Sequence, residues 1–314
     1  MYIFLFFACS STEPNPASKN TLNSDTIKEK HHEKHQEKQE ENKEEKQEKI
    51  IVEASETTKT STDEEASIDV NGFRFPSDSA LQDHPDKDRI TRGKEILLYT
   101  KKELPEYVGA NMNCSNCHLQ AGTIPTAMPF VGVRDRYPKY RDRSGKVDDL
   151  AERVNGCFER SMNGKILPTD SEDMKSILAY MNWISSEVED GKQLKEAGLQ
   201  KLSPLEPNPE NGKNLYTIKC ASCHQLTGQG ISAGDVIVYP PLWGENSYNI
   251  GAGMARLHKA AAFIKWNMPL GQGGSLTDQE AYDIASYFIY QDRPDLAKKG
   301  GDWPKGNKPT DARY

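Results

Sequence analysis

Hydrophobic and polar positions follow a helical period in several separate stretches of the 314-residue chain. The clearest stretch spans residues 277–290, where apolar residues recur every three or four positions and two acidic residues fall in the first turn. Further helical patterns cover residues 171–187, 92–99, 149–162 and 210–219. Few stretches alternate with a period of two, so the pattern predicts a mostly α-helical protein.

The predicted helices follow the same order twice. In each half of the chain, one helix comes early and an amphipathic helix closes the unit. Residues 190–208, which lie between the two units, contain glycine, lysine and two prolines, a composition typical of a linker. We therefore expect two domains, over residues 67–200 and 201–314.

Residues 10–66 have a different composition. They are rich in Lys, Glu, Gln, Ser and Thr with almost no large apolar residue, and they hold 9 basic and 15 acidic residues. Such a segment cannot bury enough apolar surface to offset the entropy of ordering, which predicts a disordered tether. It contains His31, His32 and His35, which we interpret as part of a solvated charge run rather than a metal-capturing tract.

Residues 1–9 are apolar and end at Cys9, a pattern that resembles the end of a lipoprotein signal. An ordinary cleaved secretion signal is the alternative. No apolar run reaches the 18 residues that a spanning helix needs. We expect an exported, periplasmic protein that meets the membrane only through a lipid on Cys9. The near balance of charge over the rest of the chain argues against a nucleic-acid binder.

Four of the six cysteines form two copies of the pattern C-x-x-C-H, at residues 114–118 and 220–224. This pattern attaches c-type haem, because each thiol can add to a vinyl group of one porphyrin while the histidine binds the iron. A thioredoxin-like dithiol, a zinc knuckle or a structural disulfide would not need histidine at the same offset twice. We therefore expect two covalently bound haem c groups, each inside a class I cytochrome c-like domain, held by Cys114, Cys117, His118, Cys220, Cys223 and His224.

The second haem needs another iron ligand, and Met268 is the leading candidate. It lies in the sequence Asn-Met-Pro-Leu-Gly, just before the closing helix. A thioether is a soft, neutral ligand that favours reduced iron. Met254 and Lys265 are alternative ligands, and Met268 could instead be an ordinary core residue.

The first unit has no methionine in an equivalent position, but it contains the unassigned Cys157. A thiolate on the first iron would be anionic and would stabilise Fe(III). The alternative is a buried, inert thiol. In that case the ligand would be Met162, or Met128, which follows His118 closely.

The neighbours of Cys157 favour a chemical role. A helix over residues 149–162 would place Arg153, Cys157 and Ser161 on one face, with Arg160 beside it. Guanidinium groups lower the pKa of a nearby thiol and bind oxyanions. The alternative is a surface helix whose arginines pair outward with acidic residues.

Several motifs together resemble one family. They are residues 155–165, the two C-x-x-C-H motifs, residues 267–271, Arg-Pro-Asp at 293–295 and Asp-Trp-Pro at 302–304. They are similar to dihaem thiosulfate dehydrogenases, also called tetrathionate reductases, over about residues 75–314. The resemblance implies that Cys157 is the distal ligand of the active-site haem and that Arg143, Arg153 and Ser161 hold substrate. Some members carry lysine where this chain has Asn267.

The resemblance also implies a reaction, 2 thiosulfate ⇌ tetrathionate + 2 electrons. We expect Cys157 to bond to the sulfane sulfur of one thiosulfate, with Arg160 and Lys165 assisting the arginines that offset the substrate charge. The redox partner would be another cytochrome c or a quinol-linked protein. Two other functions remain open. One is a non-catalytic dihaem electron carrier, and the other is a sulfur-oxidation cytochrome that conjugates thiosulfate to a carrier protein.

Overall fold

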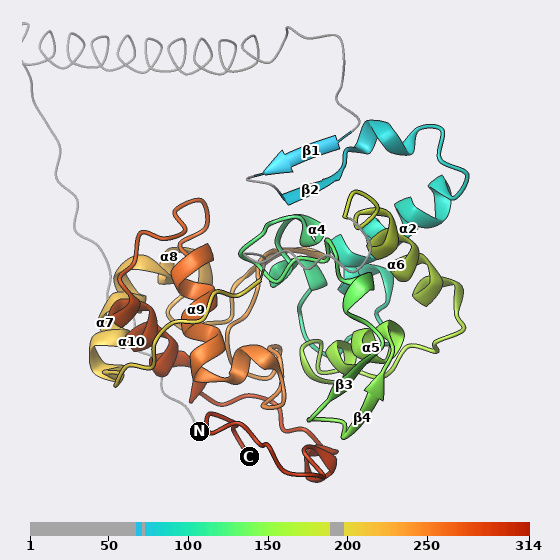
Figure 1. The fold of residues 1–314 in the computed structure, drawn as a ribbon. Coiled ribbons are helices and arrows are strands. Elements are labelled where there is room, and N and C mark those ends of the chain that lie inside the picture. Colours follow the sequence, from blue (N-terminus) through green and yellow to red (C-terminus); the bar gives the residue numbers. More distant parts are fainter. Residues whose placement is uncertain (1–66, 71–72, 189–197) are drawn as a thin grey trace, which may run out of the picture. The chain divides into compact units, whose positions relative to one another are not determined.

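The computed structural model describes residues 67–70, 73–188 and 198–314 (Figure 1). The predictions for the tether, its histidines and Cys9 lie outside these residues, as does part of the expected linker. All described residues belong to one compact unit. Within that part of the chain, no helix is both long enough and apolar enough to cross a membrane.

In the first half, helix α2 (Lys87–Leu98) crosses helix α6 (Glu172–Trp183). The crossing is close because Gly93 has no side chain, and a Cβ there would lie 2.0 Å from the Ser176 carbonyl oxygen. The sequence located both helices but not all of their ends. Helix α2 begins five residues before the predicted start, and α6 ends at Trp183 instead of continuing to residue 187.

The second half repeats this crossing with helix α7 (Pro209–Lys219) and helix α10 (Asp278–Ile289). Gly212 lies at the contact, where a Cβ would lie 1.9 Å from the Asp283 carbonyl oxygen. Thr277 caps α10, since its side chain accepts a hydrogen bond from the Glu280 backbone N–H. The repeated plan read from the sequence is therefore present in the structure.

The remaining helices are short or lie near the two C-x-x-C-H motifs. The α-helices are α3 (Thr100–Glu103), α4 (Leu119–Gly122), α5 (Leu150–Arg160), α8 (Ala221–His224) and α9 (Leu257–Asn267). The 3-10 turns are η1 (Asp78–Leu81), η2 (Cys114–Asn116), η3 (Arg134–Arg136), η4 (Gly253–Ala255) and η5 (Lys299–Gly301).

Three antiparallel hairpins complete the described fold, and the sequence pattern did not reveal them. They pair β1 (Ser67–Val70) with β2 (Phe73–Pro76), β3 (Lys139–Arg141) with β4 (Lys146–Asp148), and β5 (Ile231–Ala233) with β6 (Val236–Tyr239). Strands of three or four residues are too short to show a period of two. The mostly helical fold class is confirmed.

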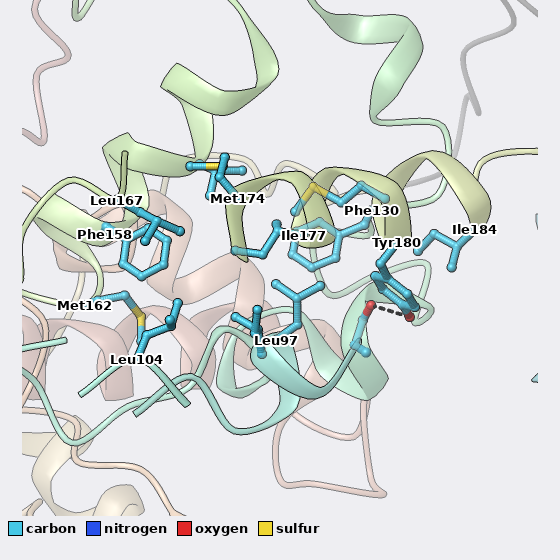
Figure 2. Packing of buried hydrophobic residues seen from close by; sticks show 14 of the residues in the cluster. Leu97, Leu104, Phe130, Phe158, Met162, Leu167, Met174, Ile177, Tyr180 and Ile184 are labelled. Carbon is cyan, nitrogen blue, oxygen red and sulfur yellow. Dashed lines mark hydrogen bonds between the residues drawn. The ribbon is translucent and has the colours of Figure 1, made fainter. Parts of the chain in front are cut away.

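The first hydrophobic cluster fills the space between α2, α5 and α6 (Figure 2). Leu97, Phe158 and Ile177 are fully buried in it, and the Tyr180 hydroxyl donates a hydrogen bond to the Ala121 carbonyl at 3.0 Å. Pairing the hydroxyl allows a large polar ring to be buried.

Residues from the second half also enter the first cluster. Tyr248, Ala252 and Ala255 are buried in it, although all three follow residue 200. A separate second cluster lies mainly on α9 and α10. The domain boundary near residue 200 stays a prediction, because the first core draws on side chains from both sides of it.

Candidate active site

A cavity of about 740 Å³ adjoins the first C-x-x-C-H motif. Cys114, Cys117 and His118 line one part of it, and the side chains of α5 line another. Most of the remaining wall is apolar, including Leu97, Phe130, Val133, Val154 and Met181. This volume and lining are those of a site that encloses a large, mainly apolar cofactor.

The two attachment cysteines are held in an apolar environment. Turn η2 begins at Cys114, and the Asn113 and Asn116 side chains each bond to the backbone of the other residue. Burial raises the pKa of the Cys114 and Cys117 thiols to about 12. Sulfur in this environment is uncharged, which suits thioether bonds to a porphyrin.

The histidine of each motif is oriented in the same way. The His118 Nδ1 lies 2.5 Å from the Met128 carbonyl oxygen, and the His224 Nδ1 lies 2.9 Å from the Pro240 carbonyl oxygen. An N–H on Nδ1 that donates to a carbonyl leaves the lone pair on Nε2, which is the arrangement of a metal-binding histidine. The His118 ring also stacks on Phe130, with 4.2 Å between centroids. Both residues therefore fit haem iron.

Helix α5 brings Cys157 to the cavity. Asp149 caps the helix, and Arg153, Cys157 and Ser161 all line the cavity, as the helical spacing predicted. The Arg153 Nη1 donates a hydrogen bond to the Cys157 Sγ at 2.8 Å. The His118 imidazole lies near the same sulfur. Cys157 and the histidine of the first C-x-x-C-H motif thus lie together in one cavity.

Electrostatics favour the thiolate of Cys157. Burial alone would raise the pKa of this thiol, but the charge of Arg153 and the nearby His118 outweigh burial and lower the pKa to about 6. The same pairing raises the pKa of Arg153. A thiolate is both the nucleophilic and the metal-binding form of cysteine.

Tyr137 supports Arg153 from the loop before β3. Its hydroxyl hydrogen-bonds Arg153 and accepts a hydrogen bond from the Arg141 Nη1 at 2.8 Å. Tyr137, Arg141 and Arg136 all line the cavity. None of the three was identified from the sequence, because Arg136 ends the short turn η3, Tyr137 follows it, and Arg141 ends the three-residue strand β3, none of which has a recognisable pattern.

The second half of the chain supplies another part of the cavity wall. Met254, Arg256, His258 and Lys259 line it from η4 and the start of α9. Sequence reasoning treated each half as a separate site and so did not identify this wall. Met254 therefore borders the first cavity, although the sequence offered it as a ligand for the second haem.

Met268 packs against the second hydrophobic cluster together with Cys220. Lys265, the other alternative ligand, is already engaged: its Nζ donates to the Leu276 carbonyl at 2.5 Å and lies 3.6 Å from the Asp278 carboxylate. Of the three candidates, the geometry favours Met268. Its neighbour Asn267 is buried and accepts a hydrogen bond from the Thr126 hydroxyl at 2.8 Å.

Comparisons with known proteins agree with this geometry. The SoxA/TsdA cytochrome c domain family matches residues 102–189, and the cbb3-type cytochrome c oxidase subunit III family matches residues 207–288. A thiosulfate dehydrogenase of Psychrobacter arcticus is 44% identical over 83% of this chain and 80% of its own length. The chain belongs to the thiosulfate dehydrogenase family.

Two further members of the thiosulfate dehydrogenase family support this assignment. The enzyme of Allochromatium vinosum is 40% identical over 72% of this chain and 86% of its own length. The solved thiosulfate dehydrogenase (TsdBA) of Marichromatium purpuratum is 34% identical with a TM-score of 0.68, and covers 70% of this chain. This chain spans about half of that solved protein, 49%. The prediction of two helical cytochrome c domains is confirmed.

Three residues of this chain that were assigned to the active site from the sequence do not line the cavity. The Arg160 Nη2 lies 2.7 Å and the Arg143 Nε 3.5 Å from the carboxylate oxygens of buried Asp302. Arg143 also lies over the Trp303 ring. The Lys165 side chain is exposed. A substrate contact for these three stays a prediction, and the geometry favours a positioning role for both arginines.

Proposed function

We propose that this chain oxidises thiosulfate to tetrathionate at Cys157, by the reaction 2 thiosulfate ⇌ tetrathionate + 2 electrons. The observation that carries the proposal is the position of the Cys157 sulfur, which interacts with Arg153 and His118 inside the cavity of the first attachment motif. An inert core thiol would not need an arginine at 2.8 Å. The relatives named thiosulfate dehydrogenase support thiosulfate as the substrate.

The cofactor set in this proposal is two covalently bound haem c groups. His118 and Cys157 would hold the first iron, and His224 and Met268 the second. The two imidazoles with Nδ1 bonded to carbonyls and the apolar setting of the attachment thiols support this assignment. When bound, each haem accepts one electron, so the pair accepts the two electrons of the reaction.

In the first step, the Cys157 thiolate forms a bond to the sulfane sulfur of one thiosulfate. Cysteine thiolate and thiosulfate together lose two electrons and give a cysteine S-thiosulfonate. The cationic Arg153 offsets repulsion between the thiolate and the incoming dianion. Ser161, one helical turn along α5, lines the cavity where its hydroxyl can donate to a sulfonate oxygen.

In the second step, the sulfane sulfur of another thiosulfate attacks the sulfur of the S-thiosulfonate that carries the sulfonate group. The bond to Cys157 breaks, tetrathionate leaves, and the thiolate is regenerated. This is a thiol–disulfide exchange in which Cys157 is the leaving group, and a low thiol pKa makes a better leaving group. The reverse sequence reduces tetrathionate at the same residues.

The cellular setting is also part of the proposal. Cytochrome c domains are typical of exported proteins, and we infer a periplasmic enzyme attached to the membrane through a lipid on Cys9. A small redox partner, another cytochrome c or a quinol-linked protein, would exchange electrons with the second haem. No nucleic acid takes part.

The test is the variant Cys157→Ala, purified with both haems attached. We expect it to lose thiosulfate-dependent haem reduction and tetrathionate formation while its haem content stays equal to wild type. Electron paramagnetic resonance of the oxidised wild type should show a low-spin thiolate-ligated haem, and the variant should lack that signal. A wild-type oxidation rate in Cys157→Ala would show that Cys157 is not the catalytic residue, and no thiosulfate oxidation by the wild type would show a non-catalytic electron carrier.

A second candidate is conjugation of thiosulfate to a carrier protein. More distant relatives named L-cysteine S-thiosulfotransferase subunit SoxA favour it, although they are only 22–24% identical over a third to a half of this chain. That function requires an added carrier protein. Tetrathionate production by the purified chain with thiosulfate and an electron acceptor alone would exclude it.

A further inference from the structure

The wall contributed by the second half carries an unusual amount of positive charge. Arg256 precedes α9 and Lys259 lies in its first turn, and both line the cavity that contains Cys157. The six cationic Lys and Arg residues of the cavity lining come from both halves of the chain: Arg136, Arg141, Arg153, Lys201, Arg256 and Lys259. Among the described lining residues there is no aspartate or glutamate.

Two of these cations already have a partner of opposite charge. Arg153 bonds to the Cys157 sulfur, and Arg256 lies 2.7 Å from the carboxylate of buried Asp311. Lys259, like Arg136, Arg141 and Lys201, has no ion pair with a carboxylate in the described part of the chain, and it is the one of these four that lies at the start of α9. Its ammonium group is held in the cavity wall without a counter-charge.

The surroundings of Lys259 make that charge costly. Burial and then the nearby cations Arg256, Arg153, Arg143 and Arg141 lower the pKa of Lys259 to about 8. The Lys259 side chain is exposed to the cavity that it lines, and a cation among other cations is stabilised when an anion binds beside it. The site is therefore built to receive an anion that the protein itself does not supply.

The orientation of α9 adds to this effect. The helix begins at the cavity, has no acidic residue in its first turn, and receives no side-chain hydrogen bond from its N-cap residue Arg256. Asp311 accepts a hydrogen bond from one of its first N–H groups, the His258 N–H, at 3.2 Å. The positive end of the helix dipole and Lys259 therefore favour negative charge in the same region of the cavity.

We propose that Lys259 binds the sulfonate group of the second thiosulfate, the one that attacks the adduct on Cys157. This inference rests on the proposed function, which joins two dianions in one cavity. Arg153 lies at the Cys157 sulfur and serves the first thiosulfate, so the second sulfonate needs a separate cation. Lys259 supplies it from the opposite half of the chain, and each end of the tetrathionate product keeps one cationic partner.

The test compares three variants of the holoprotein. Lys259→Gln should raise the KM for thiosulfate roughly 10-fold or more, the effect expected for loss of one hydrogen bond to a charged group, with a smaller change in kcat. Lys259→Arg should keep the KM near wild type, because the charge remains. Lys213→Gln removes the same charge from an exposed site on α7 and should leave the KM unchanged.

The pH dependence gives a second readout. Lysine is protonated below its pKa, so the wild-type KM should rise as the pH increases through about 8. Lys259→Arg should not show this rise, since arginine does not titrate there. The other groups facing this region, His258, Cys157 and the arginines, are the same in both proteins, so the difference isolates Lys259.

Equilibrium binding of sulfate to the oxidised holoprotein, measured by calorimetry, tests the anion site without turnover. The dissociation constant for sulfate should be higher in Lys259→Gln than in Lys213→Gln, by about the same factor as the rise in the thiosulfate KM. Equal KM and equal sulfate binding in these two variants would overturn the proposal. The proposal would also be overturned if Lys259→Gln kept the wild-type KM but changed the absorption spectrum of the first haem. That result would show that Lys259 pairs with the haem propionates. If wild type fails to oxidise thiosulfate, the proposed function is wrong, and sulfate binding still tests Lys259.

Discussion

The carboxylate of Asp302 is the counter-charge for two arginines beside the active-site helix. Its side chain is 5% exposed, and those of Arg160 and Arg143 are 17% and 19% exposed. The Tyr314 hydroxyl donates a further hydrogen bond to it. Asp302→Asn keeps the shape of the side chain but removes the negative charge, which leaves Arg143 without its carboxylate and Arg160 with only the Glu159 carboxylate, 3.8 Å away.

The expected loss of stability follows from the low exposure of the Asp302, Arg143 and Arg160 side chains. Removing one partner of a buried ion pair costs about 3–5 kcal/mol, because the remaining charge stays desolvated. For a domain of roughly 150–250 residues, 1 kcal/mol lowers the Tm by about 2–4 °C. A loss of about 3 kcal/mol therefore predicts a Tm lower by about 6–12 °C. Arg160 lies on α5, one turn after Cys157, so we also expect lower kcat for thiosulfate oxidation.

Thermal unfolding of the holoproteins, followed by circular dichroism, measures this effect. The matched control is Asp295→Asn, whose carboxylate is 63% exposed and pairs with Lys299 on the surface. Surface pairs contribute about 0–1 kcal/mol, so the control should unfold near the wild-type temperature. Adding Arg160→Met to Asp302→Asn should recover part of the loss, because it removes one of the two cations that lost the Asp302 carboxylate. If Asp302→Asn unfolds at the same temperature as the control, the reasoning about buried charge at this site is wrong.

Two other substitutions test the fold and the site. Gly212→Ala would place a Cβ 1.9 Å from the Asp283 carbonyl oxygen and should destabilise the protein by about 1–3 kcal/mol in thermal melts. Gly300→Ala, with no atom within 4 Å of its Cβ, should change little, and equal melts for the two would contradict a close helix crossing. Tyr137→Phe removes the hydroxyl that holds two cavity arginines, so the thiosulfate KM should rise several-fold, about the effect of one hydrogen bond. Tyr140→Phe, which removes a hydroxyl from an exposed tyrosine, is the control. Equal KM values in the two variants would show that the Tyr137 hydroxyl does not position the arginines.

Local chemistry explains what could be predicted from the sequence. The two C-x-x-C-H motifs are complete within five residues, so they identify the attachment sites without knowledge of the fold. The helix near the C-terminus has both an amphipathic period and a capping threonine, and its predicted bounds match α10 within one residue at each end. Helix α5 similarly follows from Asp149 and the i, i+4 spacing of Arg153 and Cys157.

The partners of the arginines could not be predicted in this way. Arg143 and Arg160 looked like substrate residues because of the resemblance and their nearness to Cys157. Their common partner Asp302 is more than 140 positions further along the chain, and only the fold brings it to them. Local spacing identifies the face of a helix, whereas a carboxylate from the C-terminal region determines which cations on that face remain available to substrate.

Helix α9 connects the two functional regions that the sequence treated as separate. It begins at the cavity with Lys259 in its first turn and ends at Asn267, directly before Met268. Its 11 residues span about 16 Å as a single rigid element. The buried Asn267 side chain is held by Thr126 of the first half, two residues before the carbonyl of Met128 that orients His118. We therefore expect a displacement of α9 at its cavity end to shift both Met268 and the His118 loop, so under the proposed function the second half of the chain would contribute to the substrate site as well as to the electron path.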